Sequence, residues 1–170
     1  TFQNIRLFGD MTVLENVKVA FSKDIHYGLL DAIFRTPRFW KTEESLTEKA
    51  MDLLSIFHLE DKADWLASSL PYGQQRKLEI ARALATNMKV LLLDEPAAGM
   101  NPTETAELLE CINTIRDRFG IAILLIEHDM SLVMNVCQRI QVIDYGQTIA
   151  TGLPEEIAAN PRVIAAYLGE

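Results

Sequence analysis

The feature that most constrains the fold is a short, unbroken apolar run, residues 90–93, that ends in the two acids Asp94 and Glu95. An apolar run without alternating polar residues is typical of a strand in a parallel sheet that is covered on both faces. Ligands of open α/β folds bind at the carboxyl ends of such strands. Carboxylates at that edge can hold Mg²⁺ and orient an attacking water. The alternative to a functional site is an ordinary strand end exposed to solvent. The neighbouring motifs distinguish between these two interpretations.

A second apolar run, residues 121–126, predicts another strand, and the segment between the two runs predicts a helix. Asn101, Pro102 and Glu104 form a helix start, and Gly120 forms a helix stop. The stripe expected to pack on the sheet consists of Leu108, Ile112, Ile115 and Phe119. Strand, helix and strand in this order predict a parallel α/β sheet.

Helical patterns dominate from Thr12 to about Leu70. Thr12 and Glu15 form a capping box that predicts a helix start. The buried face of a longer amphipathic helix is predicted at Leu46, Ala50, Leu53, Leu54 and Phe57. Between the two helices, residues 35–37 predict a turn, and Phe39 with Trp40 is expected to be an anchor. Near the C-terminus, residues 140–143 and 147–150 around Tyr145 and Gly146 predict a hairpin.

Two further motifs stand at fixed distances from the Asp94–Glu95 strand. Gly73 lies at the entrance of a predicted helix, where backbone N–H groups can approach a phosphate and the helix dipole favours negative charge. His128 follows residues 121–126, where an imidazole can hydrogen-bond a terminal phosphate. An ordinary capped turn and a surface histidine are the alternatives for each motif taken alone. Their common order along the chain favours a phosphate site.

Composition limits the classes of protein. The chain has 170 residues, 49% of them hydrophobic, which is enough for one sizeable core. Its net charge of −8 gives no electrostatic footprint for a phosphate backbone, so nucleic acid is excluded as a default partner. Cys111 and Cys137 show neither metal-ligand nor redox spacing and are expected to be free thiols. The sequence begins at Thr1 within an apolar-polar stretch, and we expect that a longer chain was cut there.

In this order the motifs resemble the ATP-binding cassette (ABC) family of transporter ATPases. The resemblance covers essentially the whole chain and implies a partial P-loop NTPase fold of the α/β class, a parallel sheet core with an α-helical subdomain. It implies a Q-loop and helical subdomain over residues 1–72 and the C-terminal part of a RecA-like core over residues 73–170. The signature tyrosine, A-A-G-M-N-P, I-E-H-D-M and the ending A-Y-L-G-E resemble ATPase subunits of bacterial branched-chain amino-acid importers. Cassettes for other solutes share several of these features.

The resemblance assigns a role to each motif residue. Asp94 matches the magnesium acid, Glu95 the general base and His128 the switch histidine. Gln3 matches the glutamine that senses Mg²⁺ and the attacking water. Asn101 closes the short loop that crosses the dimer seam. The signature segment, which closes on ATP held by the other subunit, corresponds to Leu70, Pro71, Tyr72, Gly73 and Gln74.

The sequence departs from the family pattern at three points. Pro71 stands where the family has serine, so a hydroxyl that contacts the terminal phosphate is absent. Asn101 stands where the family has aspartate, which keeps a hydrogen-bonding group without its charge. No G-x-x-x-x-G-K-[ST] loop occurs, and none of the eight glycines precedes a lysine. That loop supplies the N–H cradle and the lysine for the β- and γ-phosphates, so this chain alone is expected to be inactive.

The family likeness implies ATP and Mg²⁺ as ligands and ATP hydrolysis in the full-length protein. It also implies a second ATPase subunit, in a homo- or heterodimer, and transmembrane permease subunits as partners. The expected location is cytoplasmic, peripheral on the inner face of the cell membrane. The edge of the helical lobe from Thr12 to Trp40 is a candidate docking surface, with plain packing inside the lobe as the alternative. One rival function is a non-catalytic interaction module. Another is a cassette ATPase of DNA repair or translation, and the acidic charge balance argues against this second rival.

Overall fold

The structure is a computed structural model that describes residues 6–25 and 27–168. The chain forms two compact units that divide between Leu124 and Leu125. The division falls at a different place from the subdomain boundary after residue 72 that the family resemblance implies. That boundary stays a prediction.

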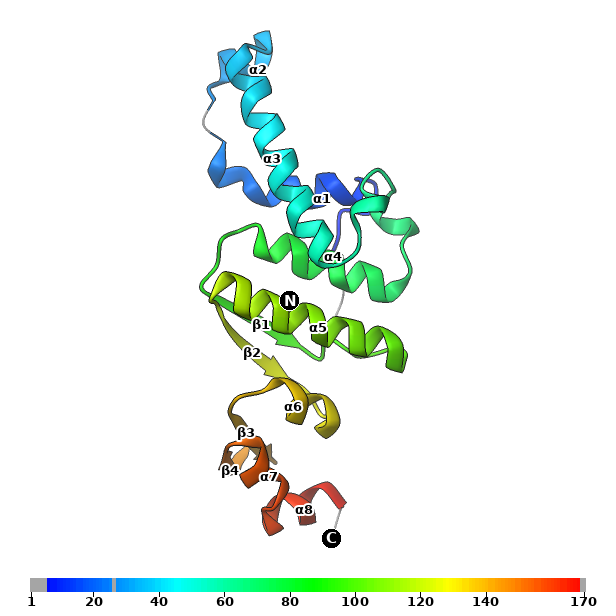
Figure 1. Ribbon diagram of the computed structural model, residues 1–170, viewed down its shortest axis with the longest axis vertical. Coiled ribbons are helices and arrows are strands. Elements are labelled where there is room, and N and C mark those ends of the chain that lie inside the picture. The colour runs from blue at the N-terminus through cyan, green and yellow to red at the C-terminus, as the bar shows by residue number, and fades with distance from the viewer. Residues whose placement is uncertain (1–5, 26, 169–170) are drawn as a thin grey trace. The chain divides into compact units, whose positions relative to one another are not determined.

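The first unit is mainly helical and contains one pair of neighbouring strands. Its long helix α3 carries the short helix α2 at the end that is remote from α4, and α5 lies alongside β1 (Figure 1). The elements in chain order are α1 (Val13–Ala20), the 3₁₀ turn η1 (Phe21–Asp24), α2 (Leu29–Phe34), α3 (Pro37–Ile56), η2 (Glu60–Lys62), η3 (Ala67–Ser69), α4 (Tyr72–Leu84), β1 (Val90–Asp94), α5 (Pro102–Phe119) and β2 (Ala122–Ile126). The division between the units falls within β2, after its third residue.

Capping explains where the helices of the lobe begin. Thr12 Oγ1 accepts from Glu15 N at 3.1 Å and Glu15 Oε2 accepts from Thr12 N at 2.8 Å, which confirms the predicted capping box of α1. The predicted stripe of α3, from Leu46 to Phe57, is buried as expected. Trp40 corrects the predicted anchor, because it is 56% exposed while its neighbour Phe39 is only half-buried. The indole is therefore part of the surface of α3 and not of the core.

Strands β1 and β2 pair in a parallel sheet and are joined by α5. A capping box starts α5, with 3.0 Å between Asn101 Oδ1 and Glu104 N and 3.0 Å between Glu104 Oε2 and Asn101 N. Gly120 ends the helix in the left-handed region at φ +59°, where a side chain would be strained. Phe119 is 40% exposed, so its predicted place in the buried stripe is wrong. It is the last residue of α5, and Cys111 completes the buried face instead.

The sheet corrects one further expectation, that its strands are covered on both faces. In β1, Leu91 and Leu93 are buried, whereas Val90 is 52% and Leu92 55% exposed. Successive side chains of a strand point to opposite faces, so only one face of β1 is covered within the described residues. Leu124 of β2 is exposed as well. The apolar runs therefore predicted the strands correctly but not the covering of their second face.

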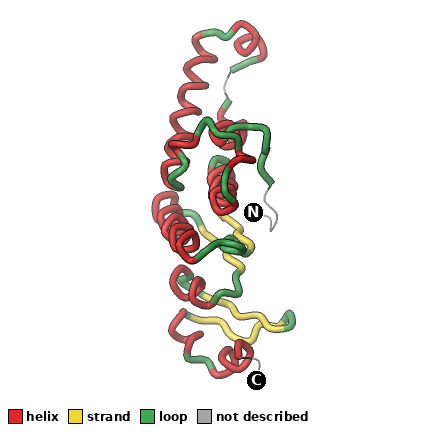
Figure 2. The backbone as a smooth tube through the Cα atoms, turned by 90° about the vertical axis from the view of Figure 1, so that its right-hand side faces the viewer, coloured by secondary structure: helices red, strands yellow, loops and turns green. Residues whose placement is uncertain are grey.

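The second unit consists of α6 (Met130–Val136), a hairpin of β3 (Ile140–Asp144) and β4 (Gln147–Gly152), α7 (Pro154–Ala158) and α8 (Pro161–Leu168). The antiparallel register pairs Ile140 with Gly152 and Asp144 with Gln147, which confirms the predicted hairpin (Figure 2). Its core is formed by Val133, Ile140, Ile157 and Val163.

Cys111 in the first unit and Cys137 in the second are free thiols, as expected. Burial raises the pKa of both thiols above its ordinary value. Among the helices that the structure describes, none has the length and apolar character that a bilayer crossing requires.

Candidate functional site

The signature segment places the first turn of α4 at the surface without a side-chain cap. Pro71 occupies the N-cap position and makes no side-chain cap hydrogen bond. Tyr72 is 46% exposed, and Gly73 behind it is buried. The first N–H groups of a helix have no partner within the helix and carry its positive dipole end. The start of this 13-residue helix is therefore chemically suited to an anion such as a phosphate.

The same helix start packs against the loop that follows β1 and against the start of α5. A Cβ atom at Gly73 would lie 2.9 Å from Glu104 Oε1, so any larger residue here requires this carboxylate to shift. A Cβ atom at Gly99, where φ is +77°, would lie 3.4 Å from Cε1 of Tyr72. The structure thus brings the signature segment and residues 97–101 together, a contact that the sequence analysis did not predict.

Asp94 and Glu95 stand at the carboxyl end of β1, and both are half-buried. Glu95 has a φ of +42°, in the left-handed region that non-glycine residues rarely adopt. Its carbonyl accepts from Ala98 N at 3.1 Å, which closes a turn immediately after the strand. Strained backbone of this kind is concentrated at functional sites, where the surrounding fold holds it. The strain sits on the residue that the sequence predicts to be the general base.

Arg76 is a site residue that the sequence analysis missed. Its side chain is fully buried, and its guanidinium contacts Glu79 Oε2 at 2.8 Å. The other terminal nitrogen donates to the Glu95 carbonyl at 3.4 Å, so α4 is tied directly to the strained turn. An arginine three positions before a glutamate on a predicted helix was the only signal available. That spacing is also found in exposed ion pairs.

A second link joins α4 to α5. Lys77 Nζ lies 2.6 Å from Glu107 Oε2, and the lysine side chain is almost completely buried. The hydrogen bond from Lys77 holds the pKa of the Glu107 carboxyl below its usual value. Arg76 and Lys77 together fix the position of the signature helix against the neighbouring loop and helix.

The burial and hydrogen bonds of the remaining predicted site residues limit the contacts that their side chains can make. The Leu70 side chain is buried, so it can act only through packing or its backbone. Gln74 Oε1 accepts from Lys62 Nζ at 3.0 Å. Asn101 Oδ1 is engaged in the capping box of α5, a role that an aspartate oxygen would fill equally well. The nucleotide contacts assigned to these residues stay predictions. Gln3 lies outside the described residues.

His128 belongs to the second unit and follows β2, as predicted. Its side chain is 78% exposed, and Nδ1 lies 3.9 Å from Oε2 of the buried Glu127 carboxylate. Asp129 caps α6 by accepting from Ser131 N at 2.9 Å. The imidazole therefore stands at an exposed strand end, flanked by a buried acid and a helix cap. Its role as a switch stays a prediction.

The acid pair fits a magnesium ion held in part by phosphates. Among the described residues there is no cluster of three or more His, Cys, Asp or Glu that could hold a metal alone. Mg²⁺ usually keeps several waters and binds one or two carboxylates together with substrate phosphates. Asp94 supplies a suitable hard oxygen ligand.

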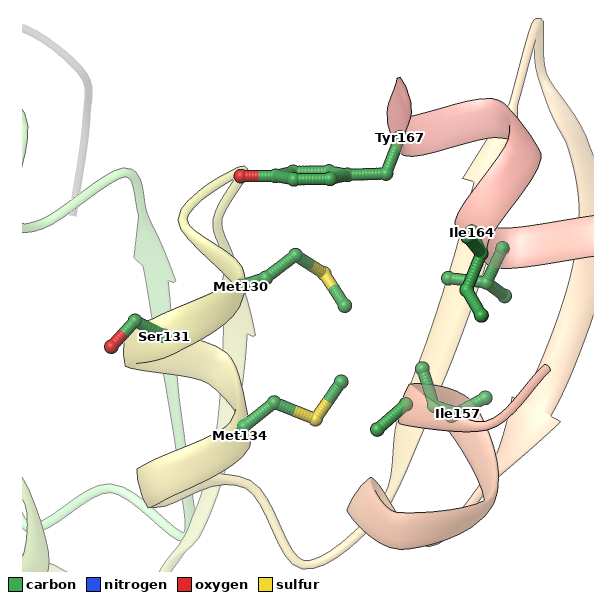
Figure 3. A pocket seen from close by; sticks show the side chains of 8 residues that line it. Met130, Ser131, Met134, Ile157, Ile164 and Tyr167 are labelled. Carbon is green, nitrogen blue, oxygen red and sulfur yellow. The ribbon is translucent and has the colours of Figure 1, made fainter. Parts of the chain in front are cut away.

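A separate pocket of about 350 Å³ lies within the second unit. Met130 and Met134 of α6 face Ile157 and Ile164 across it, and the Tyr167 ring lies over one side (Figure 3). The remaining lining residues are Ser131, Ala158 and Val163. This lining offers no cationic group for phosphates, so the pocket is not the nucleotide site.

Comparisons with known proteins agree with this arrangement. A family described as "ABC transporter" matches residues 1–98, and one described as "Branched-chain amino acid ATP-binding cassette transporter" matches residues 147–170. Over 170 residues the chain is 48% identical to the high-affinity branched-chain amino acid transport ATP-binding protein LivG of Escherichia coli and 47% identical to BraF of Pseudomonas aeruginosa. Each alignment covers 100% of this chain and 67% of the relative. The chain thus spans about two thirds of the length of these relatives.

Solved structures of cassettes have the same fold. The ADP conformation of an ATP-binding cassette of an ABC transporter is 32% identical, with a TM-score of 0.74, over 100% of this chain and 66% of that chain. A nucleotide-free cassette is 31% identical, with a TM-score of 0.71, over 100% and 68%. These likenesses confirm the predicted α/β fold of the P-loop NTPase class. The relatives also support the expected ATPase activity of the full-length protein. On the family match, the identity with LivG and the shared fold, the chain belongs to the ATP-binding cassette family of ABC transporters.

Proposed function

We propose that this chain is the larger part of the ATP-hydrolysing subunit of an importer for branched-chain amino acids. The observation that carries the proposal is the 48% identity to LivG along the entire chain. The match of residues 147–170 to the branched-chain amino acid cassettes supports the same substrate class.

In the proposed reaction, water attacks the γ-phosphate of ATP in line with the leaving oxygen. Glu95, held at the end of β1 by the turn and by Arg76, orients this water and accepts its proton. Asp94 would hold Mg²⁺, which would supply neutralisation of phosphate charge when bound. His128 hydrogen-bonds the terminal phosphate in this proposal. Catalysis then depends on positioning and charge stabilisation.

The signature helix serves a second copy of the subunit or a related one. Its first N–H groups, at Tyr72 and Gly73, have no side-chain cap, and the anion proposed to contact them is the γ-phosphate of ATP held by the other subunit. Since Pro71 has no hydroxyl, this contact relies on backbone donors. When the two subunits close, the helical lobe transmits this movement to the permease subunits. The proposed location follows, at the inner face of the membrane beside the permease.

Replacement of Glu95 by glutamine in the full-length protein tests the catalytic assignment. Loss of the proton acceptor should lower the rate of ATP hydrolysis by about 100-fold or more while nucleotide binding is retained. Glu110→Gln on the exposed side of α5 is the matched control and should leave the rate unchanged. Hydrolysis near the original rate in Glu95→Gln would show that another group is the base.

Titration of the 170-residue chain with labelled ATP and Mg²⁺ tests the proposed incompleteness of its site. Because the chain contains no phosphate-binding loop motif, we expect no binding in the micromolar range. Saturable micromolar binding would contradict this part of the proposal and leave the family assignment intact.

A further inference from the structure

Helix α2 has its apolar face turned outward. Leu29, Leu30, Ile33 and Phe34 are 78%, 70%, 62% and 75% exposed. At 100° per residue these four side chains cover one continuous arc of the helix. Asp31 and Ala32 lie on the opposite arc and are half-buried. An amphipathic helix at a protein surface normally shows the reverse arrangement.

The outward orientation is held by specific contacts. Asp31 Oδ1 accepts from Thr36 Oγ1 at 2.7 Å, and Asp31 Oδ2 accepts from Gly28 N at 3.2 Å. Through these two hydrogen bonds, the inward-facing Asp31 is linked to the residues just before and just after α2. Before the helix, Tyr27 contacts Glu43 on α3 through its hydroxyl at 2.9 Å and packs edge-on against the ring of Phe39 at 5.0 Å. The apolar face therefore belongs to a structured element with its own fixed polar side.

Basic and aromatic residues flank this apolar face. Residues 29–41, called here the α2 tip, contain Arg35, Arg38 and Lys41 against the single acid Asp31. All three basic residues are exposed, and the acid is engaged inside the tip. The rest of the chain is acidic, since the whole carries a net charge of −8. Trp40 lies exposed on the next helix, edge-on to Phe39 at 5.5 Å between ring centres.

We propose that the α2 tip binds the surface of an anionic lipid bilayer, with Leu29, Leu30, Ile33 and Phe34 inserted among the outer acyl groups. A helix that lies in a membrane interface combines an exposed apolar face with flanking Lys or Arg residues. Tryptophan is enriched at the same depth. The acidic remainder of the chain is repelled from such a surface, so the basic tip sets the orientation. The inference goes beyond nucleotide hydrolysis and does not depend on it.

Flotation of the 170-residue chain with lipid vesicles provides the test. Vesicles of phosphatidylcholine alone are compared with vesicles in which about one third of the lipid is phosphatidylglycerol. We expect binding to the anionic vesicles, weakening as salt is raised, and little binding to the neutral ones. In a Trp65→Phe background, the emission of Trp40 should shift to shorter wavelength on binding and become protected from acrylamide.

Two variants separate the apolar and the charged contributions. Ile33→Ser with Phe34→Ser should weaken binding at least ~10-fold, because both side chains lose their buried apolar area. Arg35→Gln with Arg38→Gln should weaken binding by roughly five-fold for each charge. Leu153→Ser, which removes a leucine of similar exposure from the second unit, is the matched control. It should bind as the parent does. Circular dichroism shows that each variant is folded.

Two results would overturn the proposal. The first is equal vesicle binding by the parent chain and by the two tip variants, which would assign the affinity to another exposed surface. The second is absence of binding to anionic vesicles at low salt together with capture by detergent-solubilised permease through the same tip residues. That result would make the tip a protein-docking surface. Neither result bears on the hydrolysis test, which uses Glu95.

Discussion

The buried guanidinium of Arg76 donates to the backbone carbonyl of Glu95, with 3.4 Å between nitrogen and oxygen, while its other terminal nitrogen is paired with Glu79. One side chain on the signature helix thereby reaches the strained residue at the end of β1. The position of the predicted general base is set from the helix whose start is the predicted phosphate contact.

Arg76→Met should lower the free energy of unfolding by about 3–5 kcal/mol, because it leaves the buried Glu79 carboxylate without its cation. Urea denaturation followed by circular dichroism measures the change. The double variant Arg76→Met with Glu79→Leu should recover most of the loss. Lys89→Gln, an exposed position, should change the value by less than about 0.5 kcal/mol. A small effect of Arg76→Met would show that the guanidinium is not a structural link.

The effect of Gly73→Ala on the free energy of unfolding should change sign when the residue at position 104 is changed. Alanine in a helix is more stable than glycine by about 0.5–1 kcal/mol. In the parent chain, however, the new Cβ would meet Glu104 Oε1 at 2.9 Å and disturb the capping box with Asn101. We expect Gly73→Ala to be destabilising in the parent and stabilising in a Glu104→Ala background, as measured by a double-mutant cycle in urea. Equal effects in both backgrounds would contradict the close contact.

The Glu95→Gly variant should have a free energy of unfolding about 1 kcal/mol higher than that of Glu95→Ala. The reason is that φ is +42° at this position, and only glycine adopts that region without strain. Thermal unfolding of Glu95→Gly and Glu95→Ala gives the comparison. At Ala83, in the ordinary helical conformation of α4, the same exchange to glycine should be destabilising by a similar amount. Alanine and glycine of equal stability at position 95 would mean that the turn relaxes.

The contact of Glu43 with Lys18 should make unfolding depend on pH. The hydrogen bond from Lys18, with a smaller contribution from Tyr27, holds the pKa of the Glu43 carboxyl below its usual value in the folded chain. A lowered pKa stabilises the fold at pH values above the unfolded pKa, and this contribution is lost as pH falls through the folded one.

The difference in free energy of unfolding between the parent and Glu43→Gln should therefore be largest at neutral pH. It should shrink as the pH falls below the range in which an ordinary glutamate carboxyl titrates. Urea titrations at several pH values from neutral to strongly acidic test this. In a Lys18→Met background the pH dependence of the difference should be much weaker. A difference that is constant with pH would show that the contact does not persist in solution.

The sequence by itself determined the local elements and the order of the motifs. Apolar runs predicted β1 and β2, and Thr12, Asn101 and Gly120 predicted helix ends that the structure confirms. These signals are local, because a capping side chain, a left-handed glycine and an unbroken apolar run act within a few residues. The identity of the family followed from the same ordered motifs.

Only the tertiary structure decided which predicted side chains are buried and which contacts join the motifs. Trp40 and Phe119 had the character of core residues but lie at the surface, because no element packs over them among the described residues. The burial of Arg76 and the approach of Glu104 to Gly73 join segments many residues apart. Periodicity within one helix carries no information on such distances. The outward face of α2 was also decided by packing, since the same apolar spacing fits a helix turned either way.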